Sequence, residues 1–172
     1  LKEHKLPGGG CDMGAKMRDL NEKLKAEFGL DIKYAKDVIG EGLYLDHELL
    51  AQNKLCLEKV KAAAIRILKT DPDLQWVIDY EKAAYASVPQ WVRERVINGY
   101  YHGRSGDIIL MPRINYFEWP VAKDFLGSSH GTWTPADTHI PLIFMGWNIK
   151  PGYTNRQTHM DDTAPTVCSL LH

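Results

Sequence analysis

The sequence runs Ser128-Ser-His-Gly-Thr-Trp-Thr-Pro-Ala-Asp-Thr-His-Ile-Pro141 and continues at once as Leu142-Ile-Phe-Met-Gly-Trp147. The first stretch holds a His-Gly turn at His130, the carboxylate of Asp137 and a second imidazole at His139. Imidazole and carboxylate groups held on a turn beside a buried strand are what a metal-dependent hydrolase needs. The stretch therefore predicts a strand of an α/β sheet, over residues 141–146, and indicates a phosphate-ester hydrolase.

Composition and charge are those of a globular protein. The 172 residues are 44% hydrophobic and 25% charged, which is enough to bury a core. A formal net charge of −1 gives no electrostatic case for a nucleic-acid polymer or an anionic membrane. No apolar stretch reaches the roughly 18 residues that a membrane-spanning helix needs. We therefore expect neither nucleic acid nor membrane as a partner, and the sequence does not indicate an oligomeric state.

The chain ends and the cysteines add two expectations. There is no initiator Met, and the last residues read as an uncapped apolar helix, so we expect a fragment of a longer protein. The three cysteines form no CxxC pair, which argues against a cysteine zinc site. Cys56 and Cys168 fall in helical patterns and are predicted to be buried, whereas the sequence leaves a disulfide open.

Hydrophobic periodicity predicts alternating helices and strands. Residues 113–139 read mostly as loop, and the Pro-Gly run at 7–10 predicts no regular structure. Helices are predicted over 13–28, over 55–68, from Pro89 onward and from Asp161-Asp162 to the end, and strands over 32–38, 41–46, 74–80, 108–111 and 141–146. This order favours an α+β layer of ferredoxin-like character, joined to the edge of a larger α/β sheet.

Four passages carry a resemblance to a known family. They are Ser105-Gly-Asp-Ile-Ile-Leu110, Ser129-His-Gly-Thr-Trp133, Asp137-Thr-His-Ile-Pro-Leu-Ile-Phe-Met-Gly-Trp147 and Met160-Asp-Asp-Thr-Ala-Pro-Thr166. In this order and spacing they resemble the C-terminal end of the alkaline phosphatase superfamily, in the bacterial phosphate-monoesterase branch akin to type I phosphodiesterases and nucleotide pyrophosphatases. Residues 1–102 resemble, more loosely, the insert that follows the family's Asp-His-Gly metal motif.

The resemblance implies both an organisation and a function. It divides the chain into a flexible leading segment (1–12), an α+β insert subdomain (13–111) and the C-terminal part of an alkaline-phosphatase-like core (112–172). His130 takes the position of one metal ligand in a site for two zinc ions, and the substrate would be a small-molecule phosphate ester. The family's nucleophile and other ligands are not identifiable here, so we expect the chain alone to be inactive. Export to the periplasm or beyond is implied as well.

Other polar and aromatic residues are assigned plainer roles. Asp137 and His139 are expected to shape their loop by hydrogen bonds, and Asp162 to open the last helix. Arg104 and Arg113 are expected at the solvated surface. The tryptophans expected to anchor loops or the core are Trp119, Trp133 and Trp147, and the histidines expected at the surface or hydrogen-bonded are His4, His47, His102, His159 and His172.

Two alternatives stay open at this point. The chain could be a non-catalytic ferredoxin-like module that binds a partner or oligomerises through its sheet, because a fold does not determine a function. It could also be a self-standing metal-binding protein that uses His130, Asp137 and His139.

Overall fold

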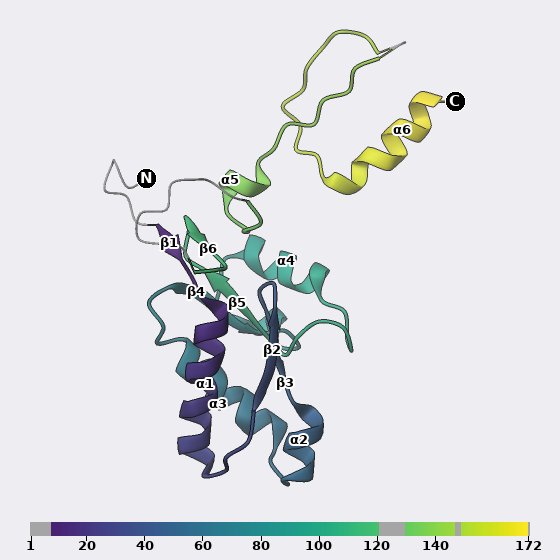
Figure 1. The fold of residues 1–172 in the computed structure, drawn as a ribbon. Helices are drawn as coiled ribbons and strands as arrows, with labels where there is room; N and C mark the ends of the chain where they lie inside the picture. Colours follow the sequence, from purple (N-terminus) through teal and green to yellow (C-terminus); the bar gives the residue numbers. More distant parts are fainter. Residues whose placement is uncertain (1–7, 121–129, 147–148, 172) are drawn as a thin grey trace. The chain divides into compact units, whose positions relative to one another are not determined.

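The computed structural model describes residues 8–120, 130–146 and 149–171. The chain divides into two compact units, residues 1–134 and 135–172. The elements of the first unit (Figure 1) are β1 (Gly9–Gly10), α1 (Met13–Phe28), β2 (Ala35–Ile39), β3 (Gly42–Leu45), α2 (His47–Gln52), α3 (Leu57–Leu68), β4 (Leu74–Asp79), η2 (Ala83–Tyr85), α4 (Gln90–Gly99), β5 (Ile108–Pro112) and β6 (Tyr116–Phe117). Those of the second are α5 (Pro135–Thr138), η3 (Met160–Asp162) and α6 (Thr163–Leu171).

Helix α1 has the predicted bounds because local signals define both of its ends. The Ala15 N–H donates to the Asp12 side chain at 2.8 Å, which satisfies one of the free donors of the first turn. Gly29 has a φ of 73° and donates its N–H to the Lys25 carbonyl, and glycine adopts this left-handed conformation without steric cost. Leu20 and Leu24 are completely buried on the inner face.

The main sheet is four-stranded and antiparallel, in the order β2-β3-β5-β4. Strands β2 and β3 form a hairpin, and β5 lies between β3 and β4. Leu43 pairs with Ile108, and Ile78 pairs with Ile109. Helices α1 and α3 contact each other (Figure 1), and each contacts a strand of the sheet. The predicted α+β arrangement is therefore confirmed.

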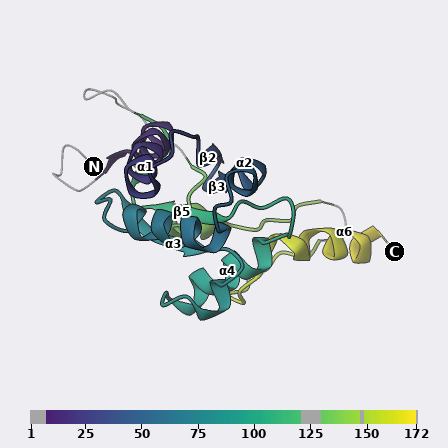
Figure 2. The same ribbon diagram turned by 90° about the horizontal axis from the view of Figure 1, so that it is seen from below.

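The side chains of β5 alternate between two hydrophobic cores. Ile108 and Leu110 belong to the core that contains residues of α1 and α3. Ile109 and Met111 belong to a second core, with Val92 and Val96 of α4. Figure 2 accordingly shows α1 and α4 on opposite sides of β5. A strand buried on both faces is continuously apolar, which is what the run over 108–111 indicated.

Two short elements of the first unit differ from expectation. Gly9 and Gly10 were expected to lack regular structure, but they form β1, which pairs in parallel with β6. The Cys11 N–H next to them donates to the Phe117 carbonyl at 2.6 Å. Pairing with a distant segment thus supplies the hydrogen bonds that local sequence does not indicate. Helix α2 was not predicted; it begins after Asp46, whose side chain accepts the Leu49 N–H at 3.0 Å.

The second unit contradicts one predicted strand and confirms one predicted helix. The prediction of a strand over 141–146 is wrong, because this segment forms no strand and pairs with no described residue. The last helix opens as predicted: the His159 N–H donates to Asp162 Oδ2 at 2.8 Å, completing a capping box ahead of α6.

The remaining sequence expectations concern cysteines, membranes and the division of the chain. All three cysteines are free, and the predicted burial of Cys56 and Cys168 is wrong. Cys56 precedes the first turn of α3, and Cys168 lies on the exposed surface of α6. No helix among the described residues is both long and apolar enough to cross a bilayer. The division at residues 12 and 111 stays a prediction, and most of the leading segment lies outside the described residues.

Candidate functional site

His130, the predicted metal ligand, lies on an exposed His-Gly turn. Gly131 has a φ of 111°, a backbone conformation that side chains disfavour, so the turn depends on glycine. The preceding serines of the motif, Ser128 and Ser129, lie outside the described residues. The accessible imidazole and the glycine-dependent turn are both compatible with a ligand presented to an ion.

The described residues do not by themselves fit a zinc ion. A hydrolytic zinc takes about three protein ligands. Among residues 8–120, 130–146 and 149–171, no group of three or more His, Cys, Asp or Glu side chains is placed to hold a metal. His130 belongs to the first unit, whereas Asp137 and His139 belong to the second. A zinc site would need ligands beyond the described residues, and the self-standing metal site gains no support.

The segment after the His-Gly turn is held by Trp133. The Arg95 guanidinium on α4 donates from Nη1 to the Trp133 carbonyl at 3.0 Å. The Trp133 side chain packs against the second core. Arg95 in turn lies over the Trp91 ring, 5.1 Å from its centroid. The predicted anchoring role of Trp133 is confirmed, and it ties the end of the motif to a helix of the first unit.

The other residues singled out from the sequence are placed as follows. Arg104 and Arg113 are exposed, as expected, and the Arg104 guanidinium lies 4.3 Å from the centroid of the Tyr101 ring. Trp119 stacks on Phe117 with ring centroids 5.4 Å apart. The roles expected for Trp147, His4 and His172 fall on residues outside the described part of the chain. The backbone N–H of His139 donates to the Pro135 carbonyl at 2.9 Å, at the end of α5, and the loop-shaping role expected for the His139 side chain stays a prediction.

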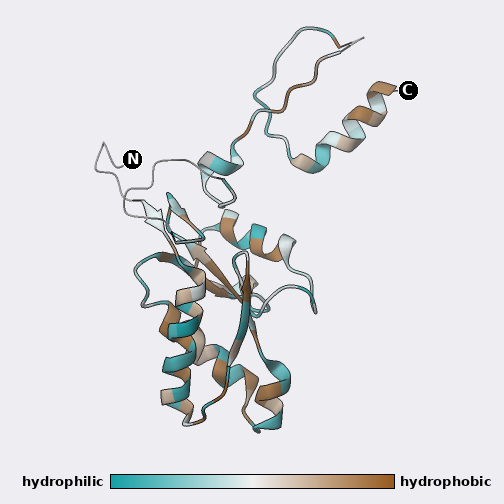
Figure 3. Cartoon of the chain, in the orientation of Figure 1, coloured by the Kyte–Doolittle hydropathy of each residue, from teal (hydrophilic) through white to brown (hydrophobic). Residues whose placement is uncertain are grey.

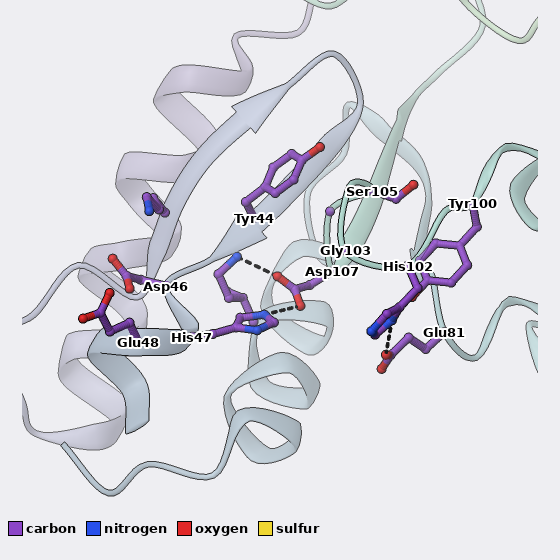
Figure 4. A pocket seen from close by; sticks show the side chains of 13 residues that line it. Tyr44, Asp46, His47, Glu48, Glu81, Tyr100, His102, Gly103, Ser105 and Asp107 are labelled. Carbon is purple, nitrogen blue, oxygen red and sulfur yellow. Dashed lines mark hydrogen bonds and ion pairs between the residues drawn. The ribbon is translucent and has the colours of Figure 1, made fainter. Parts of the chain in front are cut away.

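Sequence reasoning missed a pocket in the first unit (Figure 4). It has a volume of about 410 Å³ and lies between the end of β3, the start of α2 and the loop before β5. Asp107 is one of the residues that line it: one carboxylate oxygen accepts the Leu45 N–H at 2.8 Å, and the other lies 2.7 Å from His47 Nε2. His47 is thus hydrogen-bonded, as expected. Its partner comes from a turn far along the chain, and the only sequence signals were the Asp46 cap and the Ser105-Gly-Asp turn.

The pocket holds a histidine–carboxylate pair without a neighbouring nucleophile among the described residues. Ser105 is the hydroxyl candidate, but its Oγ accepts the Tyr101 N–H at 2.9 Å. Figure 4 shows the Ser105 side chain directed away from His47. Nucleophilic catalysis requires hydroxyl and base within hydrogen-bond reach. Among the described residues, the arrangement therefore joins the loop before β5 to β3 and to the start of α2.

A buried carboxyl group is the most perturbed acid of the first unit. Glu41 lies at the turn between β2 and β3, and its Oε1 atom is buried without a hydrogen-bond partner among the described residues. Burial, together with the nearby Glu118 charge, raises the pKa of Glu41 to about 8. The pKa of Tyr80 is also raised, to about 12; burial is the largest cause and the charge of Glu41 the next largest.

We expect the substitution Glu41→Gln to change how stability depends on pH. The folded state holds the Glu41 proton more tightly than the unfolded chain, in which the pKa is 4.5. The free energy of unfolding should therefore fall as pH rises from about 4.5 to about 8. Glu41→Gln should remove this fall and stabilise the chain above pH 8 by about 3 kcal/mol. Urea unfolding across this pH range tests the prediction. The control is Glu94→Gln, which changes an exposed glutamate. Parallel pH profiles of stability for wild type and Glu41→Gln would contradict the prediction.

Comparison with known proteins finds sequence similarity to two alkaline phosphatases and to a calcium-transporting ATPase. No protein-family profile matches it. Curated relatives are a calcium-transporting ATPase of Myroides odoratus (42% identical over 98% of this chain), the alkaline phosphatase PafA of Elizabethkingia meningoseptica (39% over 99%) and the alkaline phosphatase PhoV of Synechococcus elongatus (31% over 98%). The chain spans only 30% of the length of each.

The structural comparison agrees with the sequence comparison. The crystal structure of wild-type PafA matches 99% of this chain with a TM-score of 0.87 and 39% identity, and a PafA variant matches with a TM-score of 0.85 and 38% identity. The chain covers 31% of each of these structures. It is thus homologous to the C-terminal portion of the alkaline phosphatases PafA and PhoV, and the resemblance expected from its four passages is confirmed.

Proposed function

We propose that the chain is the C-terminal part of a zinc-dependent phosphate-ester hydrolase and that His130 supplies one metal ligand. The observation that carries the proposal is homology to PafA over 99% of the chain, at a TM-score of 0.87. The exposed His-Gly turn, tied to α4 through Trp133, supports the role of His130. The substrate would be a small-molecule phosphate ester, and the site of action the periplasm or the medium.

Zinc in such an enzyme activates a nucleophile and neutralises charge on phosphate oxygens. The described residues offer one imidazole at the turn and no complete ligand set, so the remaining ligands would lie outside the described residues. We infer from this that the isolated chain contributes to a hydrolase and does not act as one.

A chimera tests the role of His130. The matching 30% of PafA is replaced by this chain, and hydrolysis of p-nitrophenyl phosphate is measured with zinc present. We expect the chimera to be active and His130→Ala to reduce kcat/KM by at least about a hundredfold, because an incomplete ligand set holds zinc poorly. Zinc content after dialysis should fall in parallel. Bis-p-nitrophenyl phosphate and pyrophosphate, assayed alongside, distinguish monoesterase, diesterase and pyrophosphatase activity.

The matched control is His139→Ala, which removes a second exposed imidazole from the same motif. It should retain activity within a few-fold of the chimera. The chain alone should hydrolyse no more ester than buffer does. Equal losses for the two variants, or zinc-dependent hydrolysis by the free chain that His130→Ala abolishes, would contradict the proposal.

The fold gives little support to the alternative that the chain is a binding or oligomerisation module. Side chains of β5 contribute to hydrophobic cores on both faces of the main sheet, so its central surface is not free for a partner. Its edge strand β2 carries Lys36 and Asp37, both exposed, and charged side chains on an edge oppose strand pairing.

A further inference from the structure

Helix α4 carries a tryptophan and an arginine that link the main sheet to the His-Gly motif. Figure 3 shows hydrophobic and hydrophilic bands along this helix. Val92 and Val96 are buried in the second core. Trp91 and Arg95 each precede one of these valines and are one helical turn apart, so both lie beside the buried face. The Trp91 ring packs edge-on against Trp76 of β4, with ring centroids 5.7 Å apart.

The Trp91 ring restricts the orientation of Arg95. The guanidinium carbon of Arg95 lies 5.1 Å from the centroid of this ring, and its Nη1 donates to the Trp133 carbonyl at 3.0 Å. A guanidinium is planar, so contact with the face of a ring limits the directions in which its N–H groups can point. The contact with Trp91 therefore directs the donor toward Trp133, and Trp76 supports the ring from the sheet.

Trp133 is attached to the first unit at two points. Its carbonyl accepts the hydrogen bond from Arg95, and its side chain packs against the second core. Two attachments made by different groups restrict both the position and the rotation of a residue, whereas either attachment alone would leave a pivot. The hydroxyl of Thr132 donates to that of Thr134 at 3.3 Å, which restricts the chain on both sides of Trp133 further.

His130 lies only three residues before this attached point. Three residues span at most about 11 Å, so the attachment limits where the imidazole can lie. Gly131 stands between them, and glycine adopts many backbone conformations, so the turn needs a restraint from outside its own sequence. A side chain that binds or reacts has to be held within about 0.5 Å of its working position.

We propose that Arg95 is a positioning residue for His130. Through its hydrogen bond to the Trp133 carbonyl it holds the His-Gly turn in place, and it acts without contacting ion or substrate. The proposal rests on the proposed function for the role of His130 in hydrolysis, whereas the ordering of the turn can be measured in the chain alone. The competing explanation is that the contacts of Arg95 stabilise α4 and nothing more.

Backbone nitrogen relaxation measured by NMR tests the ordering of the turn in the free chain. The order parameters of residues 131–134 should be about 0.8 in the wild type and fall below about 0.6 in Arg95→Met, while those of α4 stay unchanged. Arg95→Lys keeps the charge but loses the planar group, so it should show most of the fall. The matched control is Arg66→Met, which removes an exposed arginine paired with Glu27 and should leave the turn unchanged.

A second variant leaves Arg95 in place. Trp91→Leu removes the ring that orients the guanidinium and should lower the order parameters of residues 131–134, by less than Arg95→Met does. Because the ring acts through the arginine, the double variant should be no more disordered at the turn than Arg95→Met alone. Additive losses would show that Trp91 and Arg95 act separately and would contradict this chain of contacts.

The PafA chimera tests the consequence for hydrolysis. Arg95→Met should lower both kcat/KM for p-nitrophenyl phosphate and the zinc retained after dialysis by at least about tenfold. Excess zinc in the assay should restore most of the activity, because the imidazole is displaced and not removed. Arg66→Met should change neither quantity by more than about twofold.

Each remaining outcome counts for or against a stated claim. Unchanged order parameters at residues 131–134 in Arg95→Met would overturn the proposal, and so would disorder that spreads through α4. Full activity and zinc content in a chimera that carries Arg95→Met would overturn it as well. A turn that Arg95→Met loosens, in a chimera without phosphatase activity, would support the restraint on the turn and contradict the proposed function.

Discussion

Replacement of Gly106 by alanine is expected to destabilise the first unit by about 3 kcal/mol or more. A Cβ at this position would lie 2.6 Å from the Leu43 carbonyl oxygen and 3.0 Å from its carbonyl carbon. Both atoms belong to the backbone of β3, so no side-chain rotation relieves the clash. The same carbonyl accepts the Asp107 N–H at 2.8 Å. Relief would separate β3 from the start of β5.

Urea unfolding followed by circular dichroism measures this effect. Gly99→Ala is the matched control, since a Cβ there meets nothing within 4 Å. Gly99 lies at the end of α4, where alanine should be neutral or stabilising by up to about 1 kcal/mol. A Gly106→Ala variant that unfolds within about 1 kcal/mol of wild type would show that the strand backbone moves apart at little cost, against the close packing inferred here.

The substitution Lys61→Met is expected to cost about 3 kcal/mol. The Lys61 side chain is only 2% exposed, and its Nζ lies 2.8 Å from Glu58, 3.0 Å from Glu81 and 3.3 Å from Asp79. Burial alone lowers the pKa of Lys61, but the hydrogen bonds to Glu58 and Glu81 outweigh burial and raise it. Removal of the cation leaves the largely buried Asp79 carboxylate with the exposed Lys82 as its remaining cationic neighbour.

Chemical unfolding at pH 7 measures this loss of stability. The control is Lys59→Met, because Lys59 is an exposed residue of the same helix, and this substitution should change the free energy of unfolding by less than about 0.5 kcal/mol. A pH series adds an independent readout. The hydrogen bonds from Lys61 and Lys82 lower the pKa of Glu58 to about 2, so its stabilising contribution is present above pH 4.5 and lost as pH falls toward 2. Lys61→Met should weaken this acid dependence. Similar losses of stability for Lys61→Met and Lys59→Met would contradict the role assigned to the buried Lys61 ammonium.

Elements defined by local signals were predictable, and elements that need a distant partner were not. Helix α1 has its cap residue, apolar face and terminal glycine within one continuous stretch, so its bounds of 13–28 were read directly. The apolar run over 141–146 has the composition of a strand, but a strand requires a neighbour, and the described residues provide none. The glycines of β1 show the reverse case, because β6 supplies hydrogen bonds that no local pattern announces.

The candidate site divides in the same way. His130 was found through ordered passages shared with a family, and nothing in its local geometry alone would have singled it out. The pocket around Asp107 was missed because His47 and Asp107 come together only when β3 pairs with β5. Glu41 was missed because burial, which raises its pKa, arises from tertiary packing and not from the turn sequence.

The central place of β5 also bears on how the first unit folds. This strand is the last of the sheet to be synthesised, yet it separates β3 from β4 and contributes side chains to both cores. Contacts between segments so far apart in sequence form slowly, because a long loop must close before they are made. A nascent chain that has not yet reached residue 108 would therefore hold a hairpin and helices with two incomplete cores, and arrival of β5 would complete the sheet and add its side chains to both cores.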